Sequence, residues 1–142
     1  MNKKFFVWVL FLFFLFDRFS KEFVRFFLDL GDGFSLKLFS INHVVNTGSA
    51  FGLFKDNNLF FIVLSFVVLF LIFYYRNDFL NDKRKTFFVG LITAGVLGNL
   101  FDRLIYGAVI DFIDFHFWPV FNVADSCISV GVIVLIFLFW ND

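Results

Sequence analysis

The stretch VIDFIDFHFWPVFNVADS, residues 109–126, carries Asp111, Asp114 and Asp125 and contains no lysine or arginine. Two carboxylates that face each other at close range share a proton, because both cannot ionise without a large cost in free energy. If Asp111 and Asp125 form such a pair, the ionised carboxylate can activate a water molecule and the protonated one can supply a proton to a leaving amine. This is the chemistry of aspartic proteases, and it needs no metal ion and no nucleophilic side chain. We interpret Asp114 as a solvated loop residue.

Asn122 and Asp125 also fit a purely structural interpretation. Pro119 precedes them and an apolar run follows, so the N-x-x-D spacing is typical of a capping box at the start of a helix. Asn122 would accept a hydrogen bond from a free backbone amide, and Asp125 would lie near the positive end of the helix dipole. The two interpretations are compatible, because a helix N-terminus favours the ionised form that a general base requires. We therefore favour Asp125 as the ionised member, although the charge of a coupled pair belongs to both residues.

Polar residues also interrupt two other apolar segments. Asp17 and Lys21 stand one helical turn apart, which is the spacing of an ion pair, and both a structural role and support of a site are open for them. A second stripe combines small and polar side chains at spacings of three or four residues: Gly95, Gly98, Asn99, Asp102 and Tyr106. We predict that its two glycines allow close packing of helices. Asp102 and Arg103 form either an interfacial charge pair or part of a polar site, since ionisable groups in such segments usually face a bundle interior or a polar cavity.

Other chemistries find less support in the sequence. Ser126 and Cys127 follow Asp125, but neither His43 nor His116 stands where it would serve them as a base. The two histidines match no metal-ligand spacing, and a single cysteine excludes an intramolecular disulfide and a multi-cysteine zinc cluster. The sequence contains no glycine-rich phosphate-binding motif. We therefore predict no metal and no cofactor, and expect that metal chelation leaves the activity unchanged.

These residues belong to a very apolar chain. Hydrophobic residues make up 61% of its 142 residues and aromatic residues 25%, and the mean hydropathy is +0.88, whereas soluble domains are nearer half apolar. The apolar residues fall in long blocks, which predict transmembrane helices at about 4–28, 58–76, 86–106 and 120–140. The first block resembles a signal peptide, but no small-x-small cleavage site follows it, so we predict that it remains as a helix. The length allows one domain, 1–142, and the net charge of zero gives no indication of nucleic-acid binding.

The distribution of basic residues predicts the orientation of these helices. Basic residues precede the first helix or lie between the second and the third: Lys3, Lys4, Arg76, Lys83, Arg84 and Lys85. The loop 107–118 contains none, so the positive-inside rule places both termini in the cytoplasm and this loop outside. The connection between the first two helices is then also outside, and its segment 34–54 predicts a small sheet or hairpin on the outer membrane surface. The expected fold is an all-α membrane protein with a small β element, and the aspartates cluster at its outer face.

Four ordered motifs, which together cover nearly the whole chain, resemble those of the lipoprotein signal peptidases (signal peptidase II), a family of bacterial membrane aspartyl proteases. DRFSK, residues 17–21, resembles the family's D-Q-x-x-K, and NTGSAFG, residues 46–52, resembles its N-x-G-x-A-F. GNLFDRLIYGAVIDFID, residues 98–114, is similar to G-N-x-x-D-R followed by G-x-V-x-D-F, and FNVAD, residues 121–125, is similar to F-N-x-A-D. One departure is Arg18, where the family usually has Gln. It leaves open how the side chains of the first motif form hydrogen bonds in this chain, but it does not affect the proposed aspartate pair.

The resemblance implies an aspartic endopeptidase with Asp111 and Asp125 as its catalytic dyad. It further implies a set of residues that line or support the site: Asn46, Gly48, Asn99, Asp102, Arg103, Asn122, Ala124, Asp17 and Lys21. Segment 34–54 would form an extracytoplasmic β-cradle that holds the substrate. The implied substrate is a prolipoprotein that already carries diacylglyceryl on its lipobox cysteine, and cleavage just before that cysteine would release the signal peptide.

The resemblance also implies a multi-pass protein of the bacterial cytoplasmic membrane, with its active site on the extracytoplasmic side. Its partners would be prolipoprotein substrates and membrane lipids, and we expect a monomer. From the residues alone, two other classes of protein stay open. A small ion or solute carrier would use Asp102, Arg103 and Asp125 as relay groups, but such groups belong near the membrane midplane and these lie towards one face. A non-catalytic assembly subunit would use the glycines for packing and the aspartates as helix caps.

Overall fold

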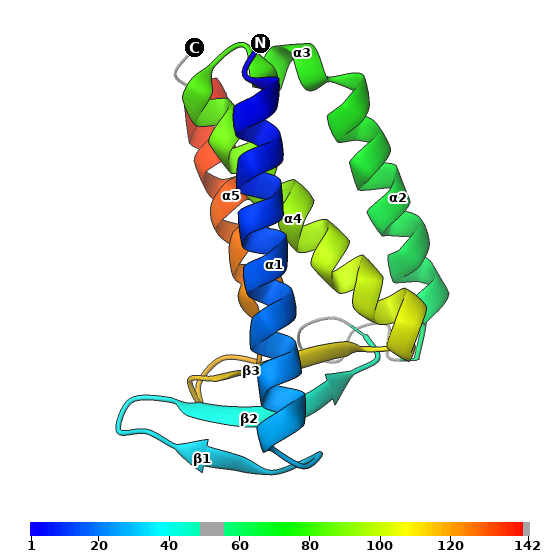
Figure 1. The fold of residues 1–142 in the computed structure, drawn as a ribbon, viewed down its shortest axis with the longest axis vertical. Coiled ribbons are helices and arrows are strands. Elements are labelled where there is room, and N and C mark those ends of the chain that lie inside the picture. Colours follow the sequence, from blue (N-terminus) through cyan, green and yellow to red (C-terminus); the bar gives the residue numbers. More distant parts are fainter. Residues whose placement is uncertain (49–55, 141–142) are drawn as a thin grey trace.

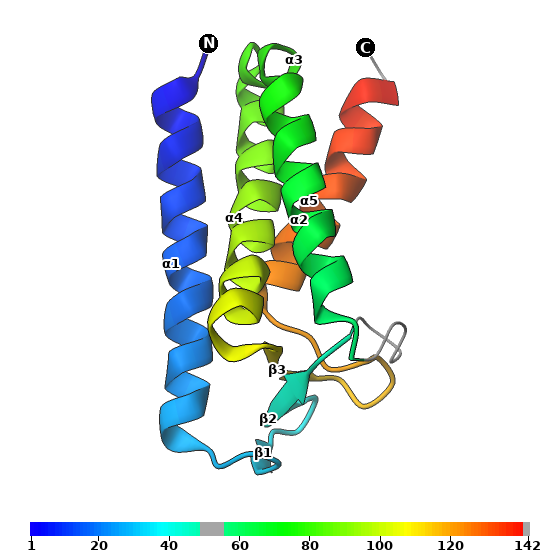
Figure 2. The ribbon, with the colours of Figure 1, turned by 90° about the vertical axis from the view of Figure 1, so that its right-hand side faces the viewer.

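The computed structural model describes residues 1–48 and 56–140, and it consists of a long bundle of helices with a small sheet at one end (Figure 1). The helices are α1 (Lys3–Phe27), α2 (Asn58–Tyr74), the short α3 (Arg76–Leu80), α4 (Lys83–Tyr106) and α5 (Val123–Trp140). The strands are β1 (Gly33–Ser35), β2 (Ser40–Asn46) and β3 (Val109–Asp114). The beginning of α1 and the end of α5 both lie at the end of the bundle opposite the sheet (Figures 1 and 2).

The helix α4 is central, because it packs against α1, α2 and α5. Two of its glycines stand where other segments approach most closely. A Cβ at Gly95 would overlap the carbonyl oxygen of Ala124 in α5, and a Cβ at Gly98 would overlap the carboxylate of Asp17 in α1. The stripe of small residues thus serves close packing, as predicted, and Gly98 in addition leaves room for a charged side chain.

The outside of the bundle is largely apolar, whereas three charged side chains of its helices, Asp17, Lys21 and Asp102, are buried inside it. Among the described helices, α4 and α5 are each long and apolar enough to cross a membrane, with mean hydropathies of 1.5 and 2.3, and α2 is a shorter apolar helix. In α1, Phe16 is 59% exposed, whereas Asp17 and Lys21 are buried. An apolar exterior around buried charges is the arrangement that a bilayer favours.

The beginning of α4 differs from the prediction by a full turn of basic residues. The helix begins at Lys83 and not at residue 86, because the side chain of Asp82 accepts hydrogen bonds from the backbone amides of Arg84 (2.7 Å) and Lys85 (3.0 Å). An aspartate in this position satisfies amides that the first turn of a helix leaves free. The helix predicted at about 58–76 is present as α2 but ends at Tyr74, and the short α3 follows it.

The sheet is antiparallel with the strand order β1-β2-β3. In the pairing of β2 with β3, Val44 lies opposite Asp111 and Asn46 lies opposite Val109, after a shift in register that follows Ile41. The prediction of a small sheet within 34–54 is confirmed for β1 and β2. Residues 49–55, which include the end of that segment and part of the NTGSAFG motif, lie outside the described residues.

The interpretation of 107–118 as a loop is wrong, because residues 109–114 form β3 and extend the sheet. Residues 109–112 are all buried, since α1 and α4 both pack against this strand. A strand covered on both faces lacks the alternation of polar and apolar residues that marks a half-exposed strand. The strand therefore has no clear signature in the sequence.

Asp114 is not a solvated loop residue, as the sequence suggested, but the last residue of β3. One of its carboxylate oxygens accepts a hydrogen bond from the side-chain amide of Asn42 at 2.8 Å. The other accepts the backbone N–H of His116 at 2.7 Å. The side chain of Asp114 thus joins β2 to the turn that follows β3, which is a structural role.

Candidate active site

Asp125 lies in the first turn of α5, just after a short pairing of the chain with β3. Phe121 pairs with Ile113, so the helix begins at Val123 and not at residue 120 as predicted. The side-chain oxygen of Asn122 accepts the N–H of Asp125 at 2.9 Å, and a carboxylate oxygen of Asp125 accepts the N–H of Asn122 at 3.2 Å. These reciprocal bonds are the predicted capping box, and they hold the carboxylate at the positive end of the helix dipole.

Asp111 lies in β3 and is only 2% exposed. Its Oδ1 accepts a hydrogen bond from the side-chain amide of Asn122 at 2.6 Å. Its Oδ2 accepts one from the side-chain amide of Asn46 at 2.7 Å, which the pairing of β2 with β3 brings within reach. Asn122 thus contacts Asp111 and Asp125 at once, so the two aspartates meet where β3 passes the start of α5.

Asn99 of α4 holds the second carboxylate oxygen of Asp125. Its side-chain N–H donates to Asp125 Oδ1 at 2.8 Å, and its side-chain oxygen accepts a hydrogen bond from the ammonium of Lys21 at 3.0 Å. A reversed amide would place N–H groups against the ammonium and an oxygen against the carboxylate. Lys21 therefore fixes Asn99 as a hydrogen-bond donor to Asp125.

A buried charge cluster lies behind the aspartate pair and joins α1 to α4. The fully buried ammonium of Lys21 contacts Asp17 at 2.8 Å and Asp102 at 2.9 Å, in addition to Asn99. The ammonium thus forms ion pairs with two carboxylates and donates a hydrogen bond to one amide oxygen. The other oxygen of Asp17 accepts the backbone N–H of Ala124 at 2.9 Å, which ties α1 to the start of α5.

A cavity of about 760 Å³ opens in front of the aspartate pair, between α2, α4, α5 and the loop that follows β3. Six of the residues predicted from the sequence line it: Asn46, Gly48, Asn99, Arg103, Asp111 and Asp125. The guanidinium of Arg103 lies over the ring of Phe61, 4.8 Å from its centroid, and donates a hydrogen bond to the carbonyl of Gly48 at 3.3 Å. The other five predicted site residues lie behind this lining: Asp17, Lys21, Asp102, Asn122 and Ala124.

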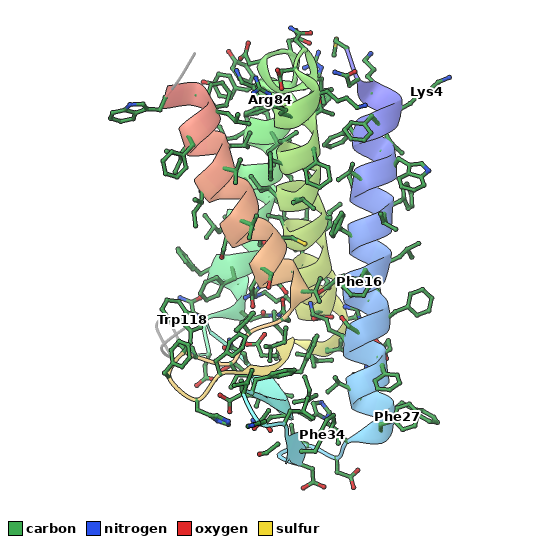
Figure 3. All side chains as sticks on the ribbon, turned by 90° about the vertical axis from the view of Figure 1, so that its left-hand side faces the viewer. Lys4, Phe16, Phe27, Phe34, Arg84 and Trp118 are labelled. Carbon is green, nitrogen blue, oxygen red and sulfur yellow. The ribbon has the colours of Figure 1, made fainter. Side chains whose placement is uncertain are left out.

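Sequence reasoning missed several residues that line the cavity. Phe117, Trp118 and Pro119 belong to the loop after β3, and Figure 3 shows Trp118 at the sheet end of the bundle. Their signal in the sequence is a run of large apolar side chains in a segment outside the predicted helices, and in the structure Phe117 stays 85% exposed. Ser65 of α2 also lines the cavity, and its signal is a hydroxyl in the apolar run LFFIVLSFVVLF.

The environment of Asp111 favours its protonated form. Burial, and after it the negative charge of Asp125, raise the pKa of Asp111 to about 7, although the hydrogen bonds from Asn46 and Asn122 act in the opposite direction. The pair can therefore hold one proton and one negative charge near neutral pH. Within the described part of the chain, no three His, Cys, Asp or Glu side chains come together to form a metal site.

Fold and site together define the class of protein. Two carboxylates on different elements share hydrogen bonds with one asparagine, and they face a cavity at one end of an apolar helical bundle, which is the arrangement of an aspartic peptidase in a membrane. The family model of signal peptidase (SPase) II matches residues 9–141. The chain belongs to the signal peptidase II family of aspartic peptidases.

Individual relatives agree with this membership. The lipoprotein signal peptidase of Thermodesulfovibrio yellowstonii is 44% identical over 136 residues, which cover 90% of this chain and 89% of the relative. That of Staphylococcus aureus is 31% identical over 156 residues, which cover all of this chain and 94% of the relative. A solved structure of a bacterial membrane enzyme matches with a TM-score of 0.91 at 28% identity, covering 96% of this chain and 88% of the other. The family membership decides against the carrier and the assembly subunit.

Proposed function

We propose that this protein removes signal peptides from diacylglyceryl-modified prolipoproteins, cutting just before the lipidated cysteine, with Asp111 and Asp125 as its catalytic dyad. The observation that carries this proposal is the meeting of two carboxylates at Asn122, beside a cavity with mostly apolar walls. The curated relatives are named lipoprotein signal peptidases, which fits a substrate of this kind. Apolar walls from α2 and α5 suit acyl chains and the apolar part of a signal peptide.

In the proposed mechanism, Asp125 is the general base. The N-terminus of α5 and the hydrogen bonds from Asn99 and Asn122 favour its ionised form. Asp125 takes a proton from a water molecule, whose oxygen attacks the scissile carbonyl carbon, while protonated Asp111 donates its proton to the developing oxyanion. In the second step Asp125 passes its proton to the leaving nitrogen and Asp111 takes back a proton from the intermediate. The C–N bond then breaks, the carbonyl re-forms and both carboxyl groups return to their starting states.

We further propose that α1, α2, α4 and α5 cross the cytoplasmic membrane of a bacterium with both termini inside and the sheet outside. The basic residues at the start of α1, in α3 and at the start of α4 support this, because Lys4 and Arg84 both lie at the end opposite the sheet (Figure 3). The sheet would then form the extracytoplasmic cradle for the substrate. Both aspartates and the cavity belong to one chain, so the proposed activity needs no second copy.

The activity should depend on pH through Asp111. Because Asp111 must hold a proton and its pKa is raised to about 7, we expect kcat/KM to fall as the pH rises through that value. The stability should follow the same direction: the folded state binds more protons than the unfolded one between the ordinary pKa of 3.8 and about 7, so the free energy of unfolding falls as the pH rises through this range. A pH profile of cleavage and a pH series of thermal unfolding measure both. A rate that stays constant from about pH 6 to about pH 9 would contradict a proton on Asp111.

The substrate class is tested with one precursor in two forms, with and without diacylglyceryl on its lipobox cysteine, and purified enzyme in detergent. We expect the unmodified form to be cut at least about 100-fold more slowly, because the acyl chains supply binding energy that positions the scissile bond. A precursor with serine in place of that cysteine cannot be modified and serves as the control. Equal cleavage of both forms would exclude the diacylglyceryl group as a determinant of substrate recognition. In a separate measurement, a loss of cleavage on addition of a metal chelator would contradict a mechanism without metal.

A further inference from the structure

The buried charge cluster contains a second cation, Arg18, whose side chain is only 11% exposed. Its guanidinium forms a short ion pair with Asp102 and a second ion pair with Glu22, at 2.8 Å. It also lies over the ring of Phe101, 4.5 Å from the centroid. Arg18 is thus held by charge on two sides and by an aromatic face on a third.

Arg18 completes the charge balance of the cluster. Without it, the carboxylates of Asp17 and Asp102 would face the single ammonium of Lys21, and one negative charge would stay buried without a partner. With Arg18, the four charges sum to zero. A buried charge without compensation is costly, and an extra negative charge would favour the protonated forms of neighbouring carboxyl groups.

Asp102 connects Arg18 to the aspartate pair. One oxygen of Asp102 pairs with Arg18. The other forms an ion pair with Lys21 at 2.9 Å and accepts a hydrogen bond at 3.4 Å from the backbone N–H of Ile110, the residue before Asp111. Lys21 also holds the oxygen of Asn99, the donor to Asp125. If Asp102 lost Arg18, it would draw the ammonium of Lys21 towards itself and away from Asn99.

We propose that Arg18 is a positioning residue for the aspartate pair: by neutralising Asp102 it keeps Lys21 on Asn99, and it sets the pH range in which the pair holds a single proton. This rests on the proposed catalytic roles of Asp111 and Asp125.

Charged groups face the pair or its supporting cluster from each packed element: Asp17 and Lys21 from α1, Asp102 and Arg103 from α4, Asp111 from β3 and Asp125 from α5. The described residues of α2 and β2 that line the cavity carry no charge. Arg18 itself does not line the cavity, so its effect must pass through these neighbours.

The test compares Arg18→Gln and Arg18→Lys by their pH profiles of kcat and KM, with purified enzyme and a diacylglyceryl-modified precursor. For Arg18→Gln we expect the profile to move to higher pH by about half a unit to one unit, as one buried charge within roughly 10 Å would produce. We also expect kcat to fall about 10-fold and KM to stay within about twofold, because Asn99 is displaced while the cavity wall is unchanged. Arg18→Lys keeps the charge and should keep the position of the profile. Glu22→Gln removes the charge of the exposed partner of Arg18, which also pairs with Arg25 and accepts from Tyr106, and serves as the matched control.

A second variant covers the case in which Arg18→Gln does not fold. The double variant Arg18→Gln/Asp102→Asn restores a net charge of zero, so its profile should return to the position of the unaltered enzyme even where kcat stays lower. An unchanged profile and kcat in folded Arg18→Gln would overturn the proposal, as would a displaced profile in Arg18→Lys or in the double variant. Asp125→Asn in the same assay separates this outcome from failure of the proposed function, because an active Asp125→Asn enzyme contradicts the dyad whatever the Arg18 variants show.

Discussion

Asp111→Asn and Asp125→Asn are each expected to lower kcat for a diacylglyceryl-modified precursor by at least about 10³-fold. Asparagine has nearly the shape of aspartate but cannot give or take a proton near neutral pH. At position 125 the substitution removes the base that activates water, and at position 111 it removes the acid that protonates the oxyanion. Single-turnover cleavage with enzyme in excess measures the chemical step, and thermal unfolding of the same samples shows whether each variant is folded.

Asp114→Asn is the matched control for this pair of variants. It changes the same residue type in the same strand, but a residue three positions from Asp111 points to the opposite face of β3. Its carboxylate contacts Asn42 and His116 and does not line the cavity. We expect its kcat to stay within about threefold of the unaltered enzyme. More than about a tenth of the normal activity in a folded Asp111→Asn or Asp125→Asn variant would contradict the dyad.

The features of the site that could be predicted from the sequence are those with a local cause. The capping box depends on two residues three positions apart, and Asn122 and Asp125 form it as expected. The pairing of Asp17 with Lys21 depends on the spacing of one helical turn. The apolar blocks depend on composition, and they coincide with the helices to within a few residues at each end. In each case the interaction lies within one element, so the linear pattern contains it.

The features that escaped prediction depend on contacts between distant segments. Asp102 lies 84 residues from Arg18, and no periodicity links the two positions. The strand β3 was not recognised because its first four residues are all buried, so that their burial does not alternate along the strand. The polarity of Asn99 is visible in the sequence, but the orientation of its amide depends on Lys21 and Asn122, which donate to its side-chain oxygen from other segments. The roles of Arg18, Asn99 and β3 depend on how the helices pack. Glycines permit that packing, but the sequence does not show which segment each glycine contacts.

Lys21→Met is expected to lower the free energy of unfolding by about 3–5 kcal/mol, the range for removing one partner of a buried ion pair. Methionine fills most of the space of the lysine stem but leaves one oxygen of Asp17 without a cation, while Arg18 still pairs with Asp102. The molecules that do fold should also cut more slowly, because Asn99 loses the bond that fixes its amide as a donor to Asp125. Thermal and denaturant unfolding in detergent measures the loss of stability, and kcat of the folded fraction measures the slower cleavage.

Arg25→Met is the control, since it removes a cation from the same helix one turn further on, where the side chain is 36% exposed and pairs with the exposed Glu22. An exposed ion pair contributes about 0–1 kcal/mol, so the difference in stability between the two variants measures the effect of burying the cluster and not the loss of a charge as such.

The double variant Lys21→Met/Asp17→Asn should recover much of the lost stability, because it removes the unpaired carboxylate. It should not recover kcat, because Asn99 still lacks its cation. A Lys21→Met protein as stable as Arg25→Met would mean that packing of apolar side chains alone holds α1 against α4. The buried charges would then contribute to catalysis and not to stability. Lys21→Met would in that case have a lower kcat but an unchanged free energy of unfolding.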